Sequence, residues 1–302
     1  FSLYQYLITN DIWAQQRVEY GYRDVRPCPL IISFSGQPYV DTRASFNSFI
    51  PATLPEETAA RLVEAYVNIL NDNPQYHDKI EFDVAFTIWT PDFFSNASSR
   101  LLPYGVTLDD ISLLEIALKK ITNKSLIRLQ KDISSIEIMN LRRNIIISSE
   151  LSTIDKIYIL LDDCKRFGTL AFAHAARAGF VATTWIQNFV ATGILTDERR
   201  LFFLKSFNTV SGEFERDKYA YSIGKLSKQE LINKYGHLRP GTYELTAQAY
   251  WEAPEKYLLS EDVDKPEIEP SFVFTEFEKK KFKRVLNKLG ASLSVEGMKN
   301  YL

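Results

Sequence analysis

The feature of this sequence that most constrains its fold is a succession of helical patterns, which begins near residue 107 and continues almost to the end of the chain. At its start, Thr107 and Asp110 have the spacing of a capping box, in which each side chain satisfies a backbone amide of the first turn. The apolar periodicity predicts helices in this part of the chain and in two segments before it. The expected helices cover about 3–20, 55–71, 107–130, 132–147, 152–166, 169–192, 196–222, 227–235 and 275–289. The pattern predicts a mainly α fold with a bundle-like helical domain.

The strand signals of the chain lie near its N-terminal third. Two β-rich runs within residues 30–41 flank Ser35-Gly36, and this arrangement is typical of a hairpin. Residues 79–90 alternate between apolar and polar side chains and give the strongest strand signal in the sequence. We therefore expect 79–90 to pair with the hairpin in a small antiparallel sheet, which adds an α+β character to the mainly α fold.

The sequence divides into three segments. Residues 1–100 combine the N-terminal helix with the small sheet, and residues 101–258 form the helical domain. Residues 259–302 begin with an acidic, proline-rich stretch at 260–271, which is typical of an extended connector, and end in an amphipathic helix.

Composition excludes several classes of function. Glycine is scarce, with 12 residues in 302, and no glycine-rich phosphate-binding motif is found. The 36 basic and 38 acidic residues give a formal charge of −2, which implies no basic face for nucleic acid, and the basic cluster at 279–284 is interpreted as a solvated helix face. No apolar stretch reaches 18 residues, so we expect no membrane-spanning helix.

Cysteine and histidine are also scarce. Cys28 and Cys164 are too few for a four-thiolate zinc site, so we expect no metal site. We expect the reduced thiols of a cytoplasmic protein, and a single disulfide between these two cysteines is the alternative. His77, at a helix end, and His174, in a stripe of small residues, are interpreted as structural. The alternative for His174 is a phosphorylatable or catalytic histidine. The N-terminus has neither a signal-peptide pattern nor an initiator methionine, which suggests a piece of a longer protein.

The densest polar cluster is residues 234–245, KYGHLRPGTYEL, where two glycines and a proline end the preceding helix. Loops held by a helical scaffold often carry functional sites. His237, Arg239 and Glu244 offer an acid–base group, an anion-binding group and a carboxylate, and they are the predicted catalytic residues. The alternative is an ordinary turn between helices with surface charges.

A second cluster contains Gln37, Asp41, Arg43 and Asn47. Asp41, Arg43 and Ser45 have the spacing of a strand, so they are expected to share one face.

Several stretches resemble a known family. Residues 235–245, followed by 250–254 (YWEAP), resemble the Y-G-x-R-x-x-G-E-x-[DE]-[LI] … R-W-x-E-x-P stretch of the phosphoenolpyruvate-synthase-like phosphotransferases, which include rifampin phosphotransferase. Residues 34–39 resemble the G-[RQ]-x-Y segment of the same superfamily. Residues 43–51 and 163–169 are similar to one subgroup, the L-glutamine kinases of capsule phosphoramidate pathways. The resemblance extends over most of residues 1–258.

The resemblance implies a modular enzyme with an ATP-grasp-like domain, a helical acceptor-binding domain and a swivelling domain with a phosphorylated histidine. ATP pyrophosphorylates the histidine, phosphate leaves, and the phosphohistidine then phosphorylates the acceptor. His174 lacks the paired glycines of the swivelling-domain signature, and no stretch looks like the ATP-grasp domain. The chain is therefore interpreted as the acceptor-binding portion. It would hold no cofactor itself, would use ATP and Mg²⁺ in the full enzyme, and would have the two other domains of the same polypeptide as partners.

The subgroup implies L-glutamine as acceptor: ATP, L-glutamine and water would give AMP, phosphate and L-glutamine phosphorylated on its amide nitrogen. The α-carboxylate requires an arginine and the α-ammonium a carboxylate, and the weakly nucleophilic amide requires a nearby base. The predicted substrate-binding residues are Asp41, Arg43, Asn47, Glu81, Arg177, Tyr235 and Tyr243. Arg239 could also stabilise the charge on the transferred phosphoryl oxygens, and His237 or Glu244 could serve as the base.

The sequence departs from the family in the same loop. Thr242 stands where the family has its first glutamate, and Pro240 precedes Gly241, whereas Glu244 matches the later acidic position. These departures imply an acceptor chemistry that differs from phosphorylation of a macrolactam hydroxyl.

Two other functions are compatible with the sequence. The first is a non-catalytic module that binds a small polar ligand or a partner domain through the same loop. The second is a phosphoenolpyruvate- or pyruvate-handling enzyme, but such enzymes use a barrel domain, and the chain has no alternating series of strands and helices.

Overall fold

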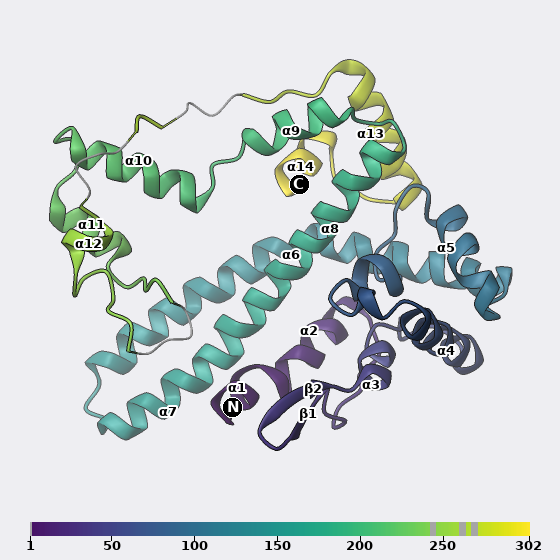
Figure 1. Ribbon diagram of the computed structural model, residues 1–302, viewed down its shortest axis with the longest axis horizontal. Helices are drawn as coiled ribbons and strands as arrows, with labels where there is room; N and C mark the ends of the chain where they lie inside the picture. Colours follow the sequence, from purple (N-terminus) through teal and green to yellow (C-terminus); the bar gives the residue numbers. More distant parts are fainter. Residues whose placement is uncertain (1, 242–245, 260–263, 267–270) are drawn as a thin grey trace. The chain divides into compact units, whose positions relative to one another are not determined.

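The computed structural model describes residues 2–241, 246–259, 264–266 and 271–302, and the chain forms two compact units (Figure 1). Unit 1 comprises Phe1–Leu195 and Thr275–Leu302, and unit 2 comprises Thr196–Phe274. The fold is mainly α with one small antiparallel sheet, which confirms the expected fold class. The two units are defined by compactness alone, which assigns no role to any part of the chain. The division of the sequence into three segments therefore stays a prediction.

Two long helical stretches form the centre of unit 1 and lie side by side (Figure 1). The first is α6, Leu108–Ser148, which begins at the predicted capping box of Thr107 and Asp110. The second consists of α7 (Thr153–Asp163), a π-helical turn η5 (Cys164–Thr169) and α8 (Leu170–Ala191). The predicted breaks within each stretch are therefore wrong.

Gly168 explains why the second stretch continues where the sequence suggested an end. A Cβ atom at Gly168 would lie 3.3 Å from Sδ of Met139 on α6, a tighter approach than most side chains tolerate. The glycine therefore allows the π-helical turn to pack closely on α6, and it does not end the helix.

The N-terminal part of unit 1 contains the predicted hairpin and several helices. Strands β1 (Ile31–Phe34) and β2 (Gln37–Val40) pair antiparallel, with Ile31 opposite Val40 and Phe34 opposite Gln37. Ser35 and Gly36 both have positive φ angles, of 50° and 80°, as a two-residue hairpin turn requires. The helices of this part are α1 (Ser2–Tyr4), the π-helical η1 (Gln5–Thr9), α2 (Ile12–Tyr20), α3 (Thr42–Asn47) and α4 (Glu56–Asp72).

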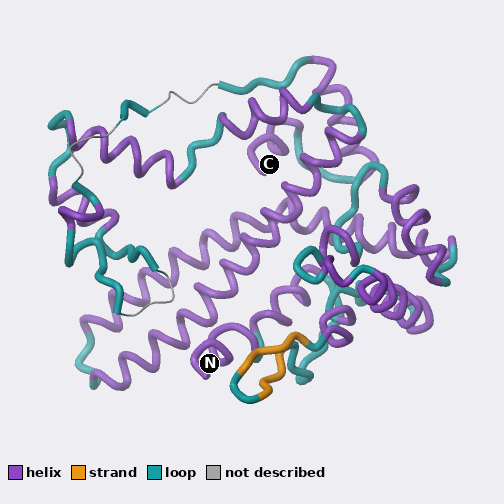
Figure 2. Tube along the Cα trace, viewed as in Figure 1, coloured by secondary structure: helices purple, strands orange, loops and turns teal. Residues whose placement is uncertain are grey.

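The predicted strand at 79–90 is wrong. Ile80–Val84 forms a π-helical turn, η3, and residues 85–90 continue without strand partners, so the hairpin is the whole sheet within the described residues (Figure 2). All residues from Val84 to Thr90 are buried, on both faces of the segment. The alternating pattern therefore reflects a segment surrounded by helices rather than a strand with one solvated face.

Helix side chains, not a neighbouring strand, satisfy the backbone of residues 85–90. Thr122 on α6 accepts a hydrogen bond from the Trp89 amide at 2.9 Å, and the Trp185 indole on α8 donates to the Trp89 carbonyl at 2.8 Å. The Tyr66 hydroxyl on α4 accepts from the Phe86 amide at 3.3 Å. Because an unpaired buried backbone group costs about as much as a lost hydrogen bond, these side chains make the buried segment possible.

The remaining helices of unit 1 are α5 (Phe93–Leu101), the 3₁₀ turns η2 (Pro74–Tyr76) and η4 (Leu102–Tyr104), α13 (Glu276–Leu289) and α14 (Val295–Tyr301). The last two bring the C-terminal part of the chain onto the long helices. Phe282 packs edge-on against Phe189 of α8, and the Tyr301 and Ser125 hydroxyls lie 2.8 Å apart. The predicted helix at 275–289 is confirmed.

Unit 2 contains α9 (Asp197–Lys205), α10 (Val210–Ser222), α11 (Lys228–Tyr235) and α12 (Pro254–Tyr257). The single helix expected over 196–222 is two helices, because Thr209 caps α10 by accepting from the Gly212 amide. Leu231, Tyr235 and Leu258 form a buried cluster. Most of the predicted connector at 260–271 lies outside the described residues.

Replacing Thr122 with valine tests the role of the side chains around residues 85–90. The shape is kept, but the buried Trp89 amide loses its acceptor, so we expect the free energy of unfolding to fall by about 1–3 kcal/mol. Urea denaturation measures this change. Thr183→Val, at an exposed position of α8, is the matched control and should change stability by less than about 0.5 kcal/mol. Equal effects of the two substitutions would contradict the interpretation.

Candidate functional site

A polar cavity of about 270 Å³ lies in unit 1, lined by α5, α8 and residues 81–92. Carboxylates, amides, hydroxyls and one guanidinium group line it, including Asp83, Asp92, Arg100, Thr184 and Asn188. A second cavity of about 570 Å³ shares Asp83 and Arg100 with it. The two cavities are therefore adjacent, and charged side chains lie at their junction. We call the first one the polar cavity.

The polar cavity concentrates buried polar atoms that lack partners. Six buried side-chain atoms in the described part of the chain have no hydrogen-bond partner. Three of them, Arg100 Nη2, Thr184 Oγ1 and Asn188 Oδ1, belong to residues that line the polar cavity. Since a buried unsatisfied polar group costs about 1–3 kcal/mol, a polar molecule in the cavity would gain stability by forming hydrogen bonds with these three atoms.

Arg100 provides a positive charge at this site. Its guanidinium group stacks over the Phe86 ring, 4.3 Å from the centroid, and its Nη1 atom donates to the Phe82 carbonyl at 3.4 Å. Burial lowers the pKa of the Arg100 side chain. Among the described residues, no carboxylate forms an ion pair with Arg100, so the group can accept an anionic ligand.

Asp83 provides the opposite charge on the wall of the same cavity. Its carboxylate is close enough to act electrostatically on Arg100, but none of the residues that the structure describes forms an ion pair with it. A separated positive and negative charge on one wall is complementary to a zwitterion, whose two charged groups each need a partner.

Asn188 is held in one orientation by Asp92. The Asn188 Nδ2 atom donates to Asp92 Oδ1, which also accepts from the Thr90 hydroxyl at 2.8 Å. Because the amide nitrogen is used in this way, the buried Oδ1 atom is the group left to accept a hydrogen bond. The polar cavity can therefore recognise an N–H donor at Asn188.

Glu81 and Arg177, two predicted substrate-binding residues, are brought together beside the polar cavity. The Arg177 guanidinium donates to Glu81 Oε2 and, at 2.9 Å, to the Thr87 carbonyl. Glu81 also accepts from the Thr87 hydroxyl at 3.1 Å. Glu81 lines the cavity, but its carboxylate is already occupied, so the pair fixes the cavity wall.

The predicted cluster at Asp41, Arg43 and Asn47 has another geometry. The strand expected there is wrong, because Thr42–Asn47 forms α3 with Asp41 as its cap, accepting from the Ala44 amide at 2.8 Å. Arg43 forms an exposed ion pair with Glu64 at 3.0 Å, and the Asn47 amide donates to the Arg43 carbonyl at 2.9 Å. None of the three lines the polar cavity.

The predicted catalytic loop lies in unit 2. His237 is exposed, and Arg239 donates to the Ala247 carbonyl, whereas Tyr243 and Glu244 lie outside the described residues. Tyr235 is buried, and its hydroxyl donates to Asp217 at 2.7 Å. That hydrogen bond anchors the loop at its start.

Described residues of two stretches that carry the family resemblance, 235–241 and 250–254, are joined by backbone hydrogen bonds. The Trp251 amide donates to the Gly236 carbonyl at 3.0 Å, and the Tyr250 amide donates to the Leu238 carbonyl at 2.9 Å. A Cβ atom at Gly236 would lie 3.2 Å from the Trp251 Cβ and 2.4 Å from the Ile232 carbonyl oxygen. Glycine is therefore required at this position by the close approach of its neighbours.

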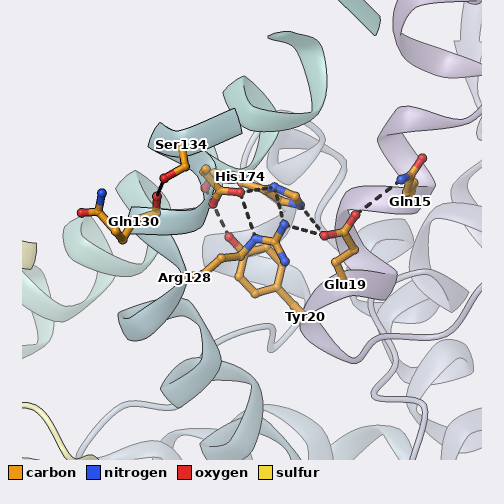
Figure 3. Close-up of polar contacts among 8 residues, drawn as sticks. Gln15, Glu19, Tyr20, Arg128, Gln130, Ser134 and His174 are labelled. Atoms are coloured by element: carbon orange, nitrogen blue, oxygen red, sulfur yellow. Dashed lines mark hydrogen bonds and ion pairs between the residues drawn. The ribbon is translucent and has the colours of Figure 1, made fainter. Parts of the chain in front are cut away.

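His174 belongs to a buried charged cluster (Figure 3). Its Nδ1 atom lies 2.9 Å from Asp132 Oδ1 and 3.0 Å from Arg128 Nη2, and Arg128 also pairs with Glu19. The Tyr20 ring packs edge-on against the imidazole. The cluster joins α2, α6 and α8, which supports the structural interpretation of His174.

Three comparisons with known proteins found no match for this chain: no family model matches it, and neither does any curated protein or solved structure.

Cys28 and Cys164 are free thiols. Within the described ranges, no helix combines the length and apolar character needed to cross a bilayer.

Arg100, Thr184 and Asn188 are not recognisable as site residues from the sequence. No local motif contains them, because they come from α5 and α8, more than eighty residues apart in the chain. Their only sequence signal is a polar residue at a helical position, and that signal occurs at many positions.

The His174 cluster should make stability depend on pH. Burial and the Arg128 guanidinium lower the pKa of His174 against the opposing effect of Asp132 and Glu19. The unfolded chain then binds a proton more readily than the folded one, so stability should decrease as pH falls through the ordinary histidine pKa of about 6.5. We expect His174→Gln to show a smaller loss between pH 7 and pH 5 than the unmodified chain, measured by urea denaturation.

The matched control for this experiment is His77→Gln, because His77 is an exposed histidine at the end of the 3₁₀ turn η2. This variant should keep the pH dependence of the unmodified chain. If His174→Gln and His77→Gln had the same pH dependence, the role given to His174 would be refuted.

Proposed function

We propose that this chain is the acceptor-binding region of an ATP-dependent phosphotransferase, in which a phosphohistidine on another domain phosphorylates a small amino acid. L-Glutamine is the acceptor that the sequence resemblance favours. The observation that carries the proposal is the polar cavity, where Arg100 and Asp83 offer opposite charges without ion-pair partners among the described residues. We further propose that the enzyme acts in the cytoplasm.

Each group of L-glutamine has a complementary group on the cavity wall. The α-carboxylate would bind Arg100, whose guanidinium can donate two hydrogen bonds in parallel, and the α-ammonium would bind Asp83. The side-chain amide would donate to Asn188 Oδ1, which the Asp92 contact leaves free. A volume of about 270 Å³ suits a molecule of this size.

The transfer step breaks the bond between the phosphoryl group and the histidine nitrogen and forms a bond to the amide nitrogen of the acceptor. The amide must also lose a proton, so the reaction requires a base. The sequence resemblance, and not the polar cavity, is the basis for proposing His237 or Glu244 in that role. Arg239 is proposed to stabilise the charge on the transferred oxygens. ATP and Mg²⁺ would act on the ATP-grasp-like domain, and this chain would supply acceptor recognition.

Calorimetric titration with L-glutamine tests the acceptor site in the full-length polypeptide. Arg100→Met should weaken binding by at least tenfold, because hydrogen bonds to charged groups contribute about 1.5–3 kcal/mol. Asp83→Asn should also weaken binding, and it should do so less for glutaramic acid, which lacks the ammonium group. The control is Arg284→Met, at an exposed position on α13. Wild-type affinity in Arg100→Met would refute the assignment.

The two half-reactions separate an enzyme from a non-catalytic binding module. In the full-length protein, we expect Arg239→Ala to form phosphohistidine from ATP at the wild-type rate and to lose transfer to the acceptor. Radiolabelled phosphate on the protein and on L-glutamine measures the two steps. Equal loss of both steps would count against the role of Arg239, and glutamine binding without any transfer by the wild-type protein would favour the binding module.

A further inference from the structure

A third cavity in unit 1, of about 750 Å³, has a different character from the polar cavity. Its walls are largely aromatic and aliphatic, with Trp13, Phe46, Phe49 and Phe180 among them. Tyr39 and Val40 of the hairpin also line it, and both are more than half exposed. We call it the aromatic cavity. An apolar wall that continues onto exposed apolar side chains is typical of a ligand entrance.

Arg17 on α2 is the cationic group buried in the wall of this cavity. Only 4% of its surface is exposed, and its guanidinium group lies 4.0 Å from the Phe49 ring centroid and 5.7 Å from that of Trp13. It donates one hydrogen bond, to the Ser48 hydroxyl. Its Nε atom is buried and has no partner. Two aromatic rings therefore lie within cation–π distance of this guanidinium group.

The charges around Arg17 do not balance. Arg177 is close enough to repel it electrostatically, and Glu81 pairs with Arg177. Among the described residues, no carboxylate pairs with Arg17, so of these two buried guanidinium groups only that of Arg177 has a carboxylate partner. Burial lowers the pKa of Arg17 to about 9, which leaves it positively charged at neutral pH. A buried unpaired charge is costly, and an anion in the cavity would remove that cost.

We propose that the aromatic cavity binds a carboxylate attached to an apolar body, with Arg17 as the carboxylate-binding residue. The body of the ligand would pack on Trp13, Phe46 and Phe180, and its carboxylate would point to the Arg17 guanidinium. The exposed residues His77, Asp78 and Lys79 form a polar rim at the cavity. L-Glutamine lacks an apolar body, so this ligand is distinct from the proposed acceptor.

The two sites share part of one wall. Glu81 and Phe82 line both the aromatic cavity and the polar cavity. An anion at Arg17 would change the electrostatic environment of the Glu81–Arg177 pair, which fixes that wall. The aromatic cavity is therefore placed to influence the polar cavity, while each site binds a different chemical class.

The test uses two probes with the same apolar body, 1-naphthoate and 1-naphthamide, in calorimetric titrations of the full-length protein. We expect 1-naphthoate to bind at least tenfold more tightly than the neutral amide. Arg17→Met should abolish this preference while leaving 1-naphthamide binding within threefold of wild type, because the apolar walls remain. Quenching of Trp13 fluorescence, absent in Trp13→Phe, locates the probe in the cavity.

A second variant keeps the test decisive if Arg17→Met fails to fold. Ser45→Phe leaves Arg17 in place but fills part of the cavity from α3, so it should weaken both probes at least tenfold. The absence of 1-naphthoate binding to the wild-type protein, or an anion preference that survives Arg17→Met, would overturn the proposal. Because neither probe is L-glutamine, the result is independent of the acceptor proposal.

Discussion

The structure of unit 1 depends on the hydrogen bonds made to residues 85–90, a buried segment of backbone without regular secondary structure. Tyr66, Thr122, Arg177 and Trp185 bond its amides and carbonyls from three different helices. Each of these bonds fixes a helix relative to the segment as well as the segment itself. The three helices α4, α6 and α8 therefore pack on this one segment, as helices in other folds pack on a central strand.

This arrangement explains where the cavities lie. A segment that leaves the helical path at Val84 cannot pack as regularly as a helix, and side chains before and after it line the spaces beside it. The Glu81–Arg177 pair, tied to the Thr87 carbonyl, keeps the wall between the polar and aromatic cavities in place. The same irregular backbone that the helices stabilise thus creates both candidate sites.

Patterns formed by residues close in the sequence predicted much of the fold correctly. The Ser35-Gly36 turn, the capping box at Thr107 and the final helix at Glu276–Leu289 depend on residues close in sequence, and all three are present. The prediction of a strand at 79–90 was wrong, because alternation of apolar and polar residues indicates a buried face but does not show whether a strand or a helix packs beside it. The predicted helix break at residues 166–169 was wrong because Gly168 allows close packing against Met139, a contact between two helices.

For the candidate sites, the sequence determined the types of residue available, and the tertiary structure decided which of them act together. Glu81 and Arg177 were recognisable as candidates, but their pairing joins positions 96 residues apart. Arg17, Arg100 and Asn188 are ordinary polar residues on helices in the sequence. Only the packing of those helices buries one polar atom of each residue without a hydrogen-bond partner. A polar side chain therefore indicates a site when its surroundings leave one of its hydrogen bonds or its charge unsatisfied.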